Sequence, residues 1–233
     1  MPTLLTFGAR NVGRIVAREL AGDGWNAAGV ARSQETIDAF AADVPGALGI
    51  TADAANPDEV ERAFAESKER FGPVDLVLNA ITDGPRSTPI VEAPADAFDS
   101  YLSGLLPAIF NVLRVGARVL SENGRGTLIQ MTGGSARRGM PQRGPWAATA
   151  FATRALTQSV AAELRDRNVH VALLIVDAVI ESEKTAGWLE GDPPERSASM
   201  DDIAKAVVYL HAQTPRAWTH ELQLTPARET WVP

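Results

Sequence analysis

The alternation of short apolar runs with segments of helical periodicity constrains the fold more than any other feature of this sequence. Residues 3–7 form a β-rich run that ends at Gly8, and apolar residues then recur at helical spacing from Val12 until Gly22. The same order of strand pattern and helix pattern repeats toward the end of the chain. It predicts an α/β fold with a doubly wound parallel sheet of about seven strands and helices on both faces.

The same patterns and the capping signals place the remaining elements. Further strands are expected at 26–30, 47–51, 75–79, 126–132, 169–177 and 222–224, and further helices at 34–42, 57–71, 95–121 and 145–165. Asn56 suits a helix cap, Pro57 suits the first helical position, and Glu59 can complete a capping box. Ser199 with Asp202 opens a last helix. We expect one domain over residues 1–233, since no linker or repeat interrupts this order.

Charge and composition exclude several classes of function. A net charge of -7 disfavours a nucleic-acid partner, which needs a basic surface. The chain has no cysteine, and its three histidines, His170, His211 and His220, do not have the spacing of metal ligands, so no metal site is expected. No signal peptide and no apolar run of about 18 residues is evident, so we expect a cytoplasmic protein with no membrane partner.

The turn after the first strand has features of a dinucleotide-binding loop. Gly8, Arg10, Asn11, Val12 and Gly13 join strand to helix, where glycines let the backbone approach a pyrophosphate and the helix amides face its charge. Only two glycines are present, so a plain strand-to-helix turn is the alternative interpretation.

The residue after the second strand bears on the choice of cofactor. Arg32 stands where NAD-binding folds usually have an acidic group for the ribose hydroxyls. Together with Arg10 it favours NADP(H) over NAD(H), if a dinucleotide binds at all. A solvated surface arginine is the alternative.

Three motifs resemble the short-chain dehydrogenase/reductase family in order and spacing, and the likeness extends over nearly the whole chain. They are residues 8–13, Thr51-Ala52-Asp53, and Leu78-Asn79-Ala80. The resemblance implies a Rossmann-like domain in which Asp53 meets the adenine and Asn79, followed by Ala80, stabilises the central sheet beside the cofactor. A helix cap and a turn asparagine are the structural alternatives for Asp53 and Asn79.

The resemblance also implies a catalytic serine, tyrosine and lysine. Ser135 matches the serine position, although a serine in a glycine-rich turn is often only a local hydrogen-bonding residue. The tyrosine and lysine positions, one helical turn apart, hold Trp146 and Ala150. No shifted copy exists, because neither Tyr101 nor Tyr209 is followed by a lysine four residues later.

Other departures agree with the missing pair. Leu105 stands where the family has an asparagine in its proton relay, and Phe7 where it has the first loop glycine. Tyr101, one turn before Leu105, is expected to be buried rather than to face the cleft. Asp83 and Glu181 are the acidic neighbours that could substitute, and both are expected to be surface charges.

Two main hypotheses follow. The first is an NADP(H)-dependent oxidoreductase of carbonyl or alcohol substrates with a degenerate, slow or inactive site, as the resemblance implies. The second is a non-enzymatic cofactor-binding sensor or the silent partner subunit of an active relative. A scaffold that binds no nucleotide is a third. The resemblance further implies a homodimer or homotetramer formed through helices 95–121 and 145–165. The second hypothesis adds a hetero-oligomer with an active relative.

Overall fold

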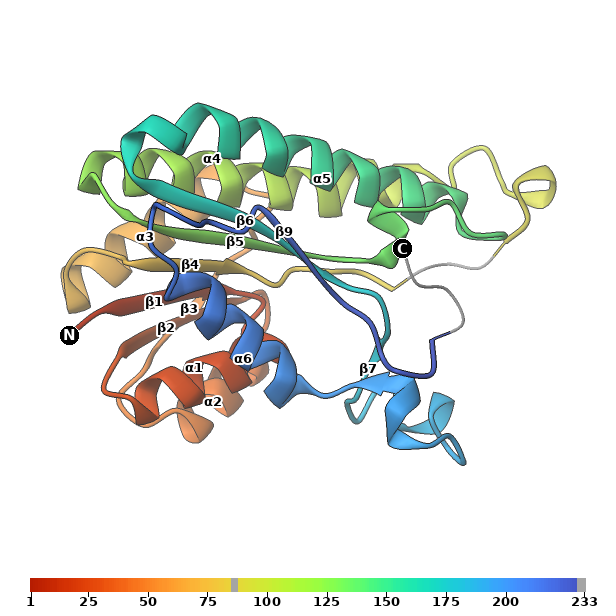
Figure 1. Ribbon diagram of the computed structural model, residues 1–233, viewed down its shortest axis with the longest axis horizontal. Helices are drawn as coiled ribbons and strands as arrows, with labels where there is room; N and C mark the ends of the chain where they lie inside the picture. The colour runs from red at the N-terminus through yellow and green to blue at the C-terminus, as the bar shows by residue number, and fades with distance from the viewer. Residues whose placement is uncertain (85–87, 230–233) are drawn as a thin grey trace.

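The computed structural model describes residues 1–84 and 88–229, and its main feature is a seven-stranded parallel sheet with strand order β3-β2-β1-β4-β5-β6-β9 (Figure 1). Chain order reverses between β1 and β4, so the predicted doubly wound sheet of about seven strands is confirmed. The strands are β1 (Thr3–Phe7), β2 (Asn26–Ala31), β3 (Leu48–Thr51), β4 (Leu76–Asn79), β5 (Gly126–Gly133), β6 (Val169–Val176) and β9 (Glu221–Leu224).

Helices cover both faces of the sheet, as the alternating pattern predicts. On one face lie α3, α4 and α5, and on the other α1, α2 and α6 (Figure 1). Their bounds are α1 (Val12–Gly22), α2 (Gln34–Asp43), α3 (Pro57–Phe71), α4 (Leu106–Asn123), α5 (Gly144–Leu164) and α6 (Met200–His211).

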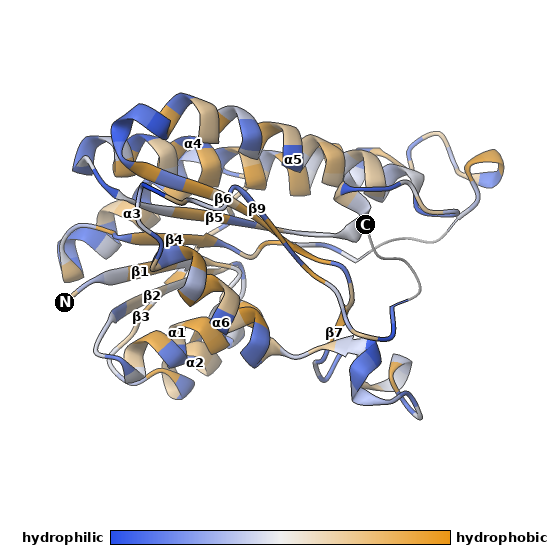
Figure 2. Cartoon of the chain, in the orientation of Figure 1, coloured by the Kyte–Doolittle hydropathy of each residue, from blue (hydrophilic) through white to orange (hydrophobic). Residues whose placement is uncertain are grey.

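The core consists of two apolar layers, one on each side of the sheet. Apolar residues fill the strands and the inward faces of the helices, and polar residues occupy the outward faces (Figure 2). Strands β4 and β6 are buried at every position, as expected for parallel strands covered on both faces. Burial of this apolar surface is the main force that holds the fold together.

All but one of the predicted strands and helices that have stated bounds agree with the structure to within one residue at each end. The exception is the helix expected at 95–121, because residues 95–98 form a turn, in which Ala97 donates to the Pro94 carbonyl, and helical structure starts only at Asp99. The continuous α-helix α4 begins only at Leu106, after a π-helical turn over Tyr101–Leu105. Pro107 explains the break, since it has no N–H to donate to the preceding turn.

The segment between β6 and α6 contains a short two-stranded sheet. Strand β7 (Val179–Ile180) pairs in parallel with β8 (Ser197–Ala198), and residues 181–196 lie between them. This pairing was not predicted, since two-residue strands have no sequence pattern of their own.

One helical stretch within the described residues, Tyr101–Asn123, is long and apolar enough to cross a membrane by length and composition alone. Core helices of soluble proteins pass the same test. Several apolar residues of α4 are buried in the core, among them Val112, Leu113 and Leu120. Their burial accounts for the apolar composition of this stretch.

Candidate functional site

The turn between β1 and α1 lies at the carboxyl edge of the sheet, directly against the end of β4. Gly8 has a φ of 93°, and a Cβ there would lie 2.9 Å from the carbonyl carbon of Ala80. A Cβ on Gly13 would lie 2.5 Å from the Gly8 carbonyl oxygen. Both positions therefore require glycine, because only a residue without a Cβ permits this close approach.

The first turn of α1 is open to an anion. The Asn11 side chain makes no capping hydrogen bond, and this turn contains no acidic residue. Val12 and Gly13 are buried and hold the helix start against the sheet, while Arg10 is exposed beside it. Amide groups at such a helix start, with the positive end of the helix dipole, suit a phosphate group.

Arg32 lies next to this turn, immediately after β2. It is exposed, and neither it nor Arg10 forms a salt bridge with any residue in the described part of the chain. The next residue, Ser33, caps α2 by accepting a hydrogen bond from the Thr36 amide at 3.3 Å. Both guanidinium groups are thus free to meet an anionic ligand at this edge.

Asp53 follows β3 and is exposed. Its carboxylate accepts a hydrogen bond from the Ala55 amide at 3.0 Å, and its own amide donates to Glu59 at 2.8 Å. The predicted capping box is therefore wrong in one detail, since Glu59 bonds the Asp53 amide and the Asn56 side chain rather than the Asn56 backbone amide. The Glu59 carboxylate lies close to the Asp53 amide, on the far side of the Asn56 cap, because the chain turns tightly at residues 53–56.

Asn79 ends β4 and is fully buried. Its side chain donates to the Gln130 side chain of β5 at 2.8 Å and accepts from the Ile81 amide at 3.2 Å. Ala80 donates its amide proton to the Phe7 carbonyl at 2.8 Å. These bonds fix the ends of β1, β4 and β5 relative to one another beside the glycine turn.

Trp146 and Ala150 lie one turn apart near the start of α5 and line the same small cavity, of about 10 Å³. That volume is roughly what a single water needs. No residue in its lining is ionisable. The other lining residues are Ile81, Thr82, Leu105, Ile109, Met131, Thr132, Thr149 and Thr153.

Ser135 is not among the residues that line this cavity. It lies in a 3-10 turn, Gly134–Ala136, after β5, and is 1% exposed. Its hydroxyl has no hydrogen-bond partner in residues 1–84 and 88–229. The structure therefore brings Trp146 and Ala150 together but leaves the Ser135 hydroxyl outside the cavity that they line.

A partly buried ion pair beside Ser135 was not predicted. Arg138 donates to Asp177 through both terminal nitrogens, at 2.5 and 3.3 Å, and Gln223 donates to the same carboxylate at 3.3 Å. Asp177 directly follows the apolar strand β6, at the carboxyl edge of the sheet, where ligands bind in such folds. This position in the sequence could have identified Asp177 as a candidate site residue.

A second ionic group joins α5 to the edge strand β9. Arg154 donates to both oxygens of Glu221 at 2.7 and 2.8 Å, and Gln158 donates to it at 2.8 Å. Burial favours a higher pKa for the Glu221 carboxyl, but the hydrogen bonds from Arg154 and Gln158 outweigh it and lower that pKa. The carboxylate stays charged and fastens β9 to α5.

The other candidate proton donors lie away from the cavity or face elsewhere. The Tyr101 ring is buried against Trp146, and its hydroxyl donates to the Gly84 carbonyl at 3.2 Å. Asp83 and Glu181 are exposed, as predicted, and bond to the Gly84 amide and the Ser197 hydroxyl. Over the ranges 1–84 and 88–229, no cluster of three or more potential metal-ligating side chains occurs.

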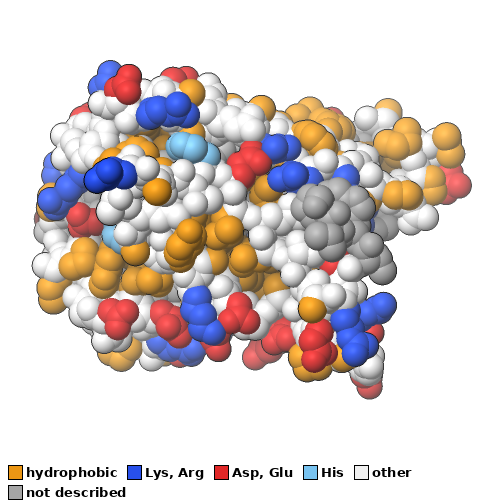
Figure 3. Space-filling view, in the orientation of Figure 1, with side chains coloured by type: hydrophobic (Ala, Val, Ile, Leu, Met, Phe, Trp, Pro, Cys, Tyr) orange, Lys and Arg blue, Asp and Glu red, His pale blue; other side chains and the backbone are white. Residues whose placement is uncertain are grey.

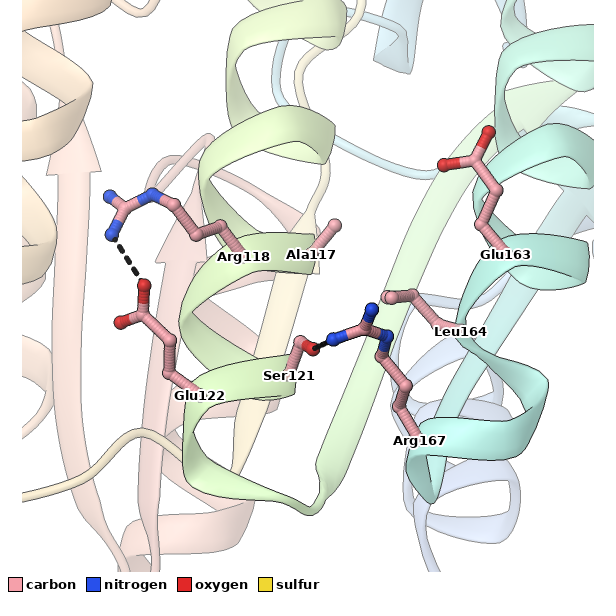
Figure 4. Close-up of a pocket in the computed structure, with 7 residues that line it drawn as sticks. All are labelled: Ala117, Arg118, Ser121, Glu122, Glu163, Leu164 and Arg167. Atoms are coloured by element: carbon pink, nitrogen blue, oxygen red, sulfur yellow. Dashed lines mark hydrogen bonds and ion pairs between the residues drawn. The ribbon is translucent and has the colours of Figure 1, made fainter.

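A larger groove, of about 590 Å³, lies between the last turns of α4 and α5 (Figure 4). Arg118 pairs with Glu122, and Arg167 donates to Ser121 across the groove. Because α4 leads directly into the start of β5, this groove is at the amino edge of the sheet. It is therefore remote from the glycine turn.

Comparison with known proteins places this geometry in a family. The family model described as Enoyl-(Acyl carrier protein) reductase matches residues 8–221. L-xylulose reductase of Bos taurus is 26% identical over 201 residues, which cover 86% of this chain and 80% of that protein. NADPH-dependent pterin aldehyde reductase of Arabidopsis thaliana is 29% identical over 173 residues, covering 73% of this chain and 72% of that protein.

A solved structure shares the complete fold. Alcohol dehydrogenase from the archaeon Thermococcus sibiricus, complexed with 5-hydroxy-NADP, superposes with a TM-score of 0.86 at 25% identity and covers 100% of both chains. The glycine turn, the ordered sheet and these matches agree with the resemblance in the sequence. The chain belongs to the short-chain dehydrogenase/reductase family.

Proposed function

We propose that this protein binds NADP(H) at the carboxyl edge of its sheet and interconverts carbonyl and alcohol substrates slowly or not at all. The observation that carries the proposal is the cavity beside Trp146 and Ala150, whose ten lining residues include no ionisable group. Binding and catalysis are therefore separable in this chain. We also place the protein in the cytoplasm.

The cofactor's phosphates fit the open helix start. The backbone of the Gly8–Gly13 turn and the first amides of α1 would hold the pyrophosphate, and Arg32 with Arg10 would meet an additional ribose phosphate. Asp53 is exposed at the neighbouring strand end, where the adenine would lie. The Arabidopsis relative is NADPH-dependent, and the Thermococcus enzyme holds an NADP derivative, which supports NADP(H) over NAD(H).

The proton step is where this chain lacks machinery. A bound NADPH would supply the hydride, but the carbonyl oxygen also has to gain a proton. Trp146 can donate a hydrogen bond through its indole N–H and does not release that proton near neutral pH. Loss of a positioned general acid costs about 10²- to 10⁴-fold in rate. The absence of a lysine at Ala150 also removes a charge that would hold the nicotinamide ribose.

A non-enzymatic role is the second candidate, either as a cofactor sensor or as the silent partner of an active relative. It is favoured by exposed apolar side chains on the two long helices, since Phe110 of α4 is 47% and Phe151 of α5 is 43% exposed. We propose that these helices associate with a second copy or a related chain. A solution mass equal to that of the 24.8 kDa monomer would contradict association with a second copy.

The test of the proposed function is NADPH consumption with a panel of aldehydes and ketones, alongside a binding measurement. We expect saturable NADPH binding with turnover at or near the rate at which the cofactor decays by itself. Turnover in the usual enzymatic range, about 1–10³ per second, would show that the site has a proton donor that we have not recognised.

A further inference from the structure

We infer that Gly133, and not Ser135, holds the position from which a hydroxyl would reach a substrate carbonyl, so that this chain lacks three catalytic groups rather than two. The inference deepens the proposed function, and its activity test rests on that function. The supporting observation is that the last residue of β5, Gly133, lies close to the Trp146 ring.

Gly133 is the last residue of β5 and is half-buried at the carboxyl edge. A Cβ built there would have the Trp146 ring at 3.9 Å and the Val176 carbonyl at 3.8 Å as its nearest neighbours, both in ordinary contact. Its φ of -100° and ψ of 175° suit any residue. A side chain at position 133 would therefore project toward the indole without strain.

Ser135 lies beyond this point, in the 3-10 turn, where almost nothing of it is exposed. The turn is held tightly by its neighbours. A Cβ on Gly134 would collide with the Asp177 carboxylate, which shows how closely that group packs against the turn. Asp177 is in turn held by Arg138 at 2.5 Å. The Ser135 hydroxyl cannot reach the cavity unless this packing breaks.

The far side of the turn is also fixed. Arg154 of α5 donates to the Ala136 carbonyl at 3.5 Å, while the same guanidinium is bound to Glu221. The turn therefore lies between two ion pairs, Arg138 with Asp177 and Arg154 with Glu221. Because the two ion pairs hold the turn in place, Ser135 cannot take over the role of a serine at position 133, the last position of β5.

The chemical consequence is specific. A substrate carbonyl beside Trp146 would meet an indole at 146 and a methyl group at 150, which both line the cavity. Gly133 does not line it, but a Cβ at that position would lie 3.9 Å from the Trp146 ring. Among these three, only the indole N–H can donate a hydrogen bond. On this inference, restoring the tyrosine and the lysine alone would still leave no hydroxyl at position 133.

The absence of cysteine permits a direct test that needs no activity. Single variants Gly133→Cys and Ser135→Cys each carry one thiol, whose reaction with Ellman's reagent is followed in the folded protein. We expect Gly133→Cys to react at least about tenfold faster, because thiol reactivity depends on exposure. After denaturation the two should react alike. Equal rates in the folded state, or a faster Ser135→Cys, would overturn the inference.

An activity test covers the case in which Ser135→Cys does not fold. The reference is the double variant Trp146→Tyr/Ala150→Lys, and Gly133→Ser is added to it. We expect the triple variant to reduce aldehydes with NADPH about tenfold faster or more, since one positioned donor has effects of this order or larger. Adding Ser135→Ala to the triple variant should change its rate by less than about threefold.

The outcomes separate the inference from the proposed function. A triple variant that folds and binds NADPH but is no faster than the double variant contradicts the inference, as does loss of activity through Ser135→Ala. If the unmodified protein fails to bind NADPH, the proposed function fails. The thiol rates measured without cofactor still decide whether position 133 or 135 faces the cleft.

Discussion

The rings of Tyr101 and Trp146 lie with their centroids 6.1 Å apart and their planes inclined by 53°. Tyr101 is buried in the π-helical turn before α4, and its hydroxyl donates to the Gly84 carbonyl. The phenol thus supports the indole and the loop after β4. Our account therefore assigns the phenol a structural role rather than that of a proton donor.

Replacement of Tyr101 by Phe tests this assignment. The variant loses the hydrogen bond to the Gly84 carbonyl, so its free energy of unfolding should fall by about 1 kcal/mol, measured by urea denaturation. Its affinity for NADPH and any residual turnover should stay within about twofold of the unmodified protein. A large loss of turnover with stability preserved would identify Tyr101 as a proton donor.

Gly8→Ala should damage both folding and cofactor binding. The left-handed φ and the 2.9 Å approach to Ala80 predict a destabilisation of about 1–3 kcal/mol, together with weaker NADPH binding. Gly22→Ala is the matched control, because nothing lies within 4 Å of its Cβ position at the end of α1. The control should be neutral or up to about 1 kcal/mol more stable. Equal effects of the two substitutions would refute the close-approach argument.

Arg32→Ala should weaken NADPH binding and leave NADH binding unchanged. Loss of a charge-assisted contact with the extra phosphate predicts about 1.5–3 kcal/mol, or roughly tenfold to a hundredfold in Kd, by titration calorimetry. Arg216→Ala is the control, since Arg216 is exposed, without a salt bridge in the described part of the chain, and follows α6 at the opposite edge of the sheet. A parallel loss of NADH affinity would argue against a phosphate contact.

Stability should fall as the pH is lowered below about 6.5, the ordinary histidine value. Burial lowers the pKa of His170, which stacks on Trp218 and faces His220, and burial also lowers the pKa of His211. Because the unfolded chain then binds more protons than the folded one, acid favours unfolding until both folded-state pKa values are passed. Urea midpoints between about pH 7.5 and about pH 5.5 measure the slope. His170→Gln should reduce it, and an unchanged slope would exclude His170 as a contributor.

Local signals explain why most of the fold could be predicted from the sequence. Asn56 accepts from the Asp58 amide with Pro57 at the helix start, and Ser199 accepts from the Asp202 amide, so both helix starts fall where expected. The start of α4 could not be predicted, because the periodic residues before it resemble a helix. The π-helical turn depends on how Pro107 and Tyr101 fit against the core.

The site was predictable only in part, because its polar pairs join residues far apart in the chain. Arg138 and Asp177 meet through the pairing of β5 with β6, in which Gly133 lies beside Val176. Sequence spacing alone also could not show that the 3-10 turn removes Ser135 from the cavity. The glycine turn was easier to find, since Gly8 and Gly13 lie close together in the sequence.

The most direct test of the central claim is a titration with NADPH, and with NADH in parallel, followed by tryptophan fluorescence in the unmodified protein and in Trp146→Phe. Our account predicts NADPH binding with a Kd of about 1 μM, weaker NADH binding, and a fluorescence response that Trp146→Phe largely removes. Absence of binding by either nucleotide at about 1 mM would contradict the account and leave a scaffold or partner subunit that acts through its surface.

Hydrophobic side chains also gather on the face over α6 and β9 (Figure 3), and Tyr209, which belongs to α6, is 56% exposed. The titration should therefore be run at several protein concentrations. If association through such a surface completes the cofactor site, the apparent Kd for NADPH will fall as protein concentration rises. The account predicts saturable NADPH binding at every concentration. No detectable binding of NADPH even at the highest protein concentration is the result that would contradict it.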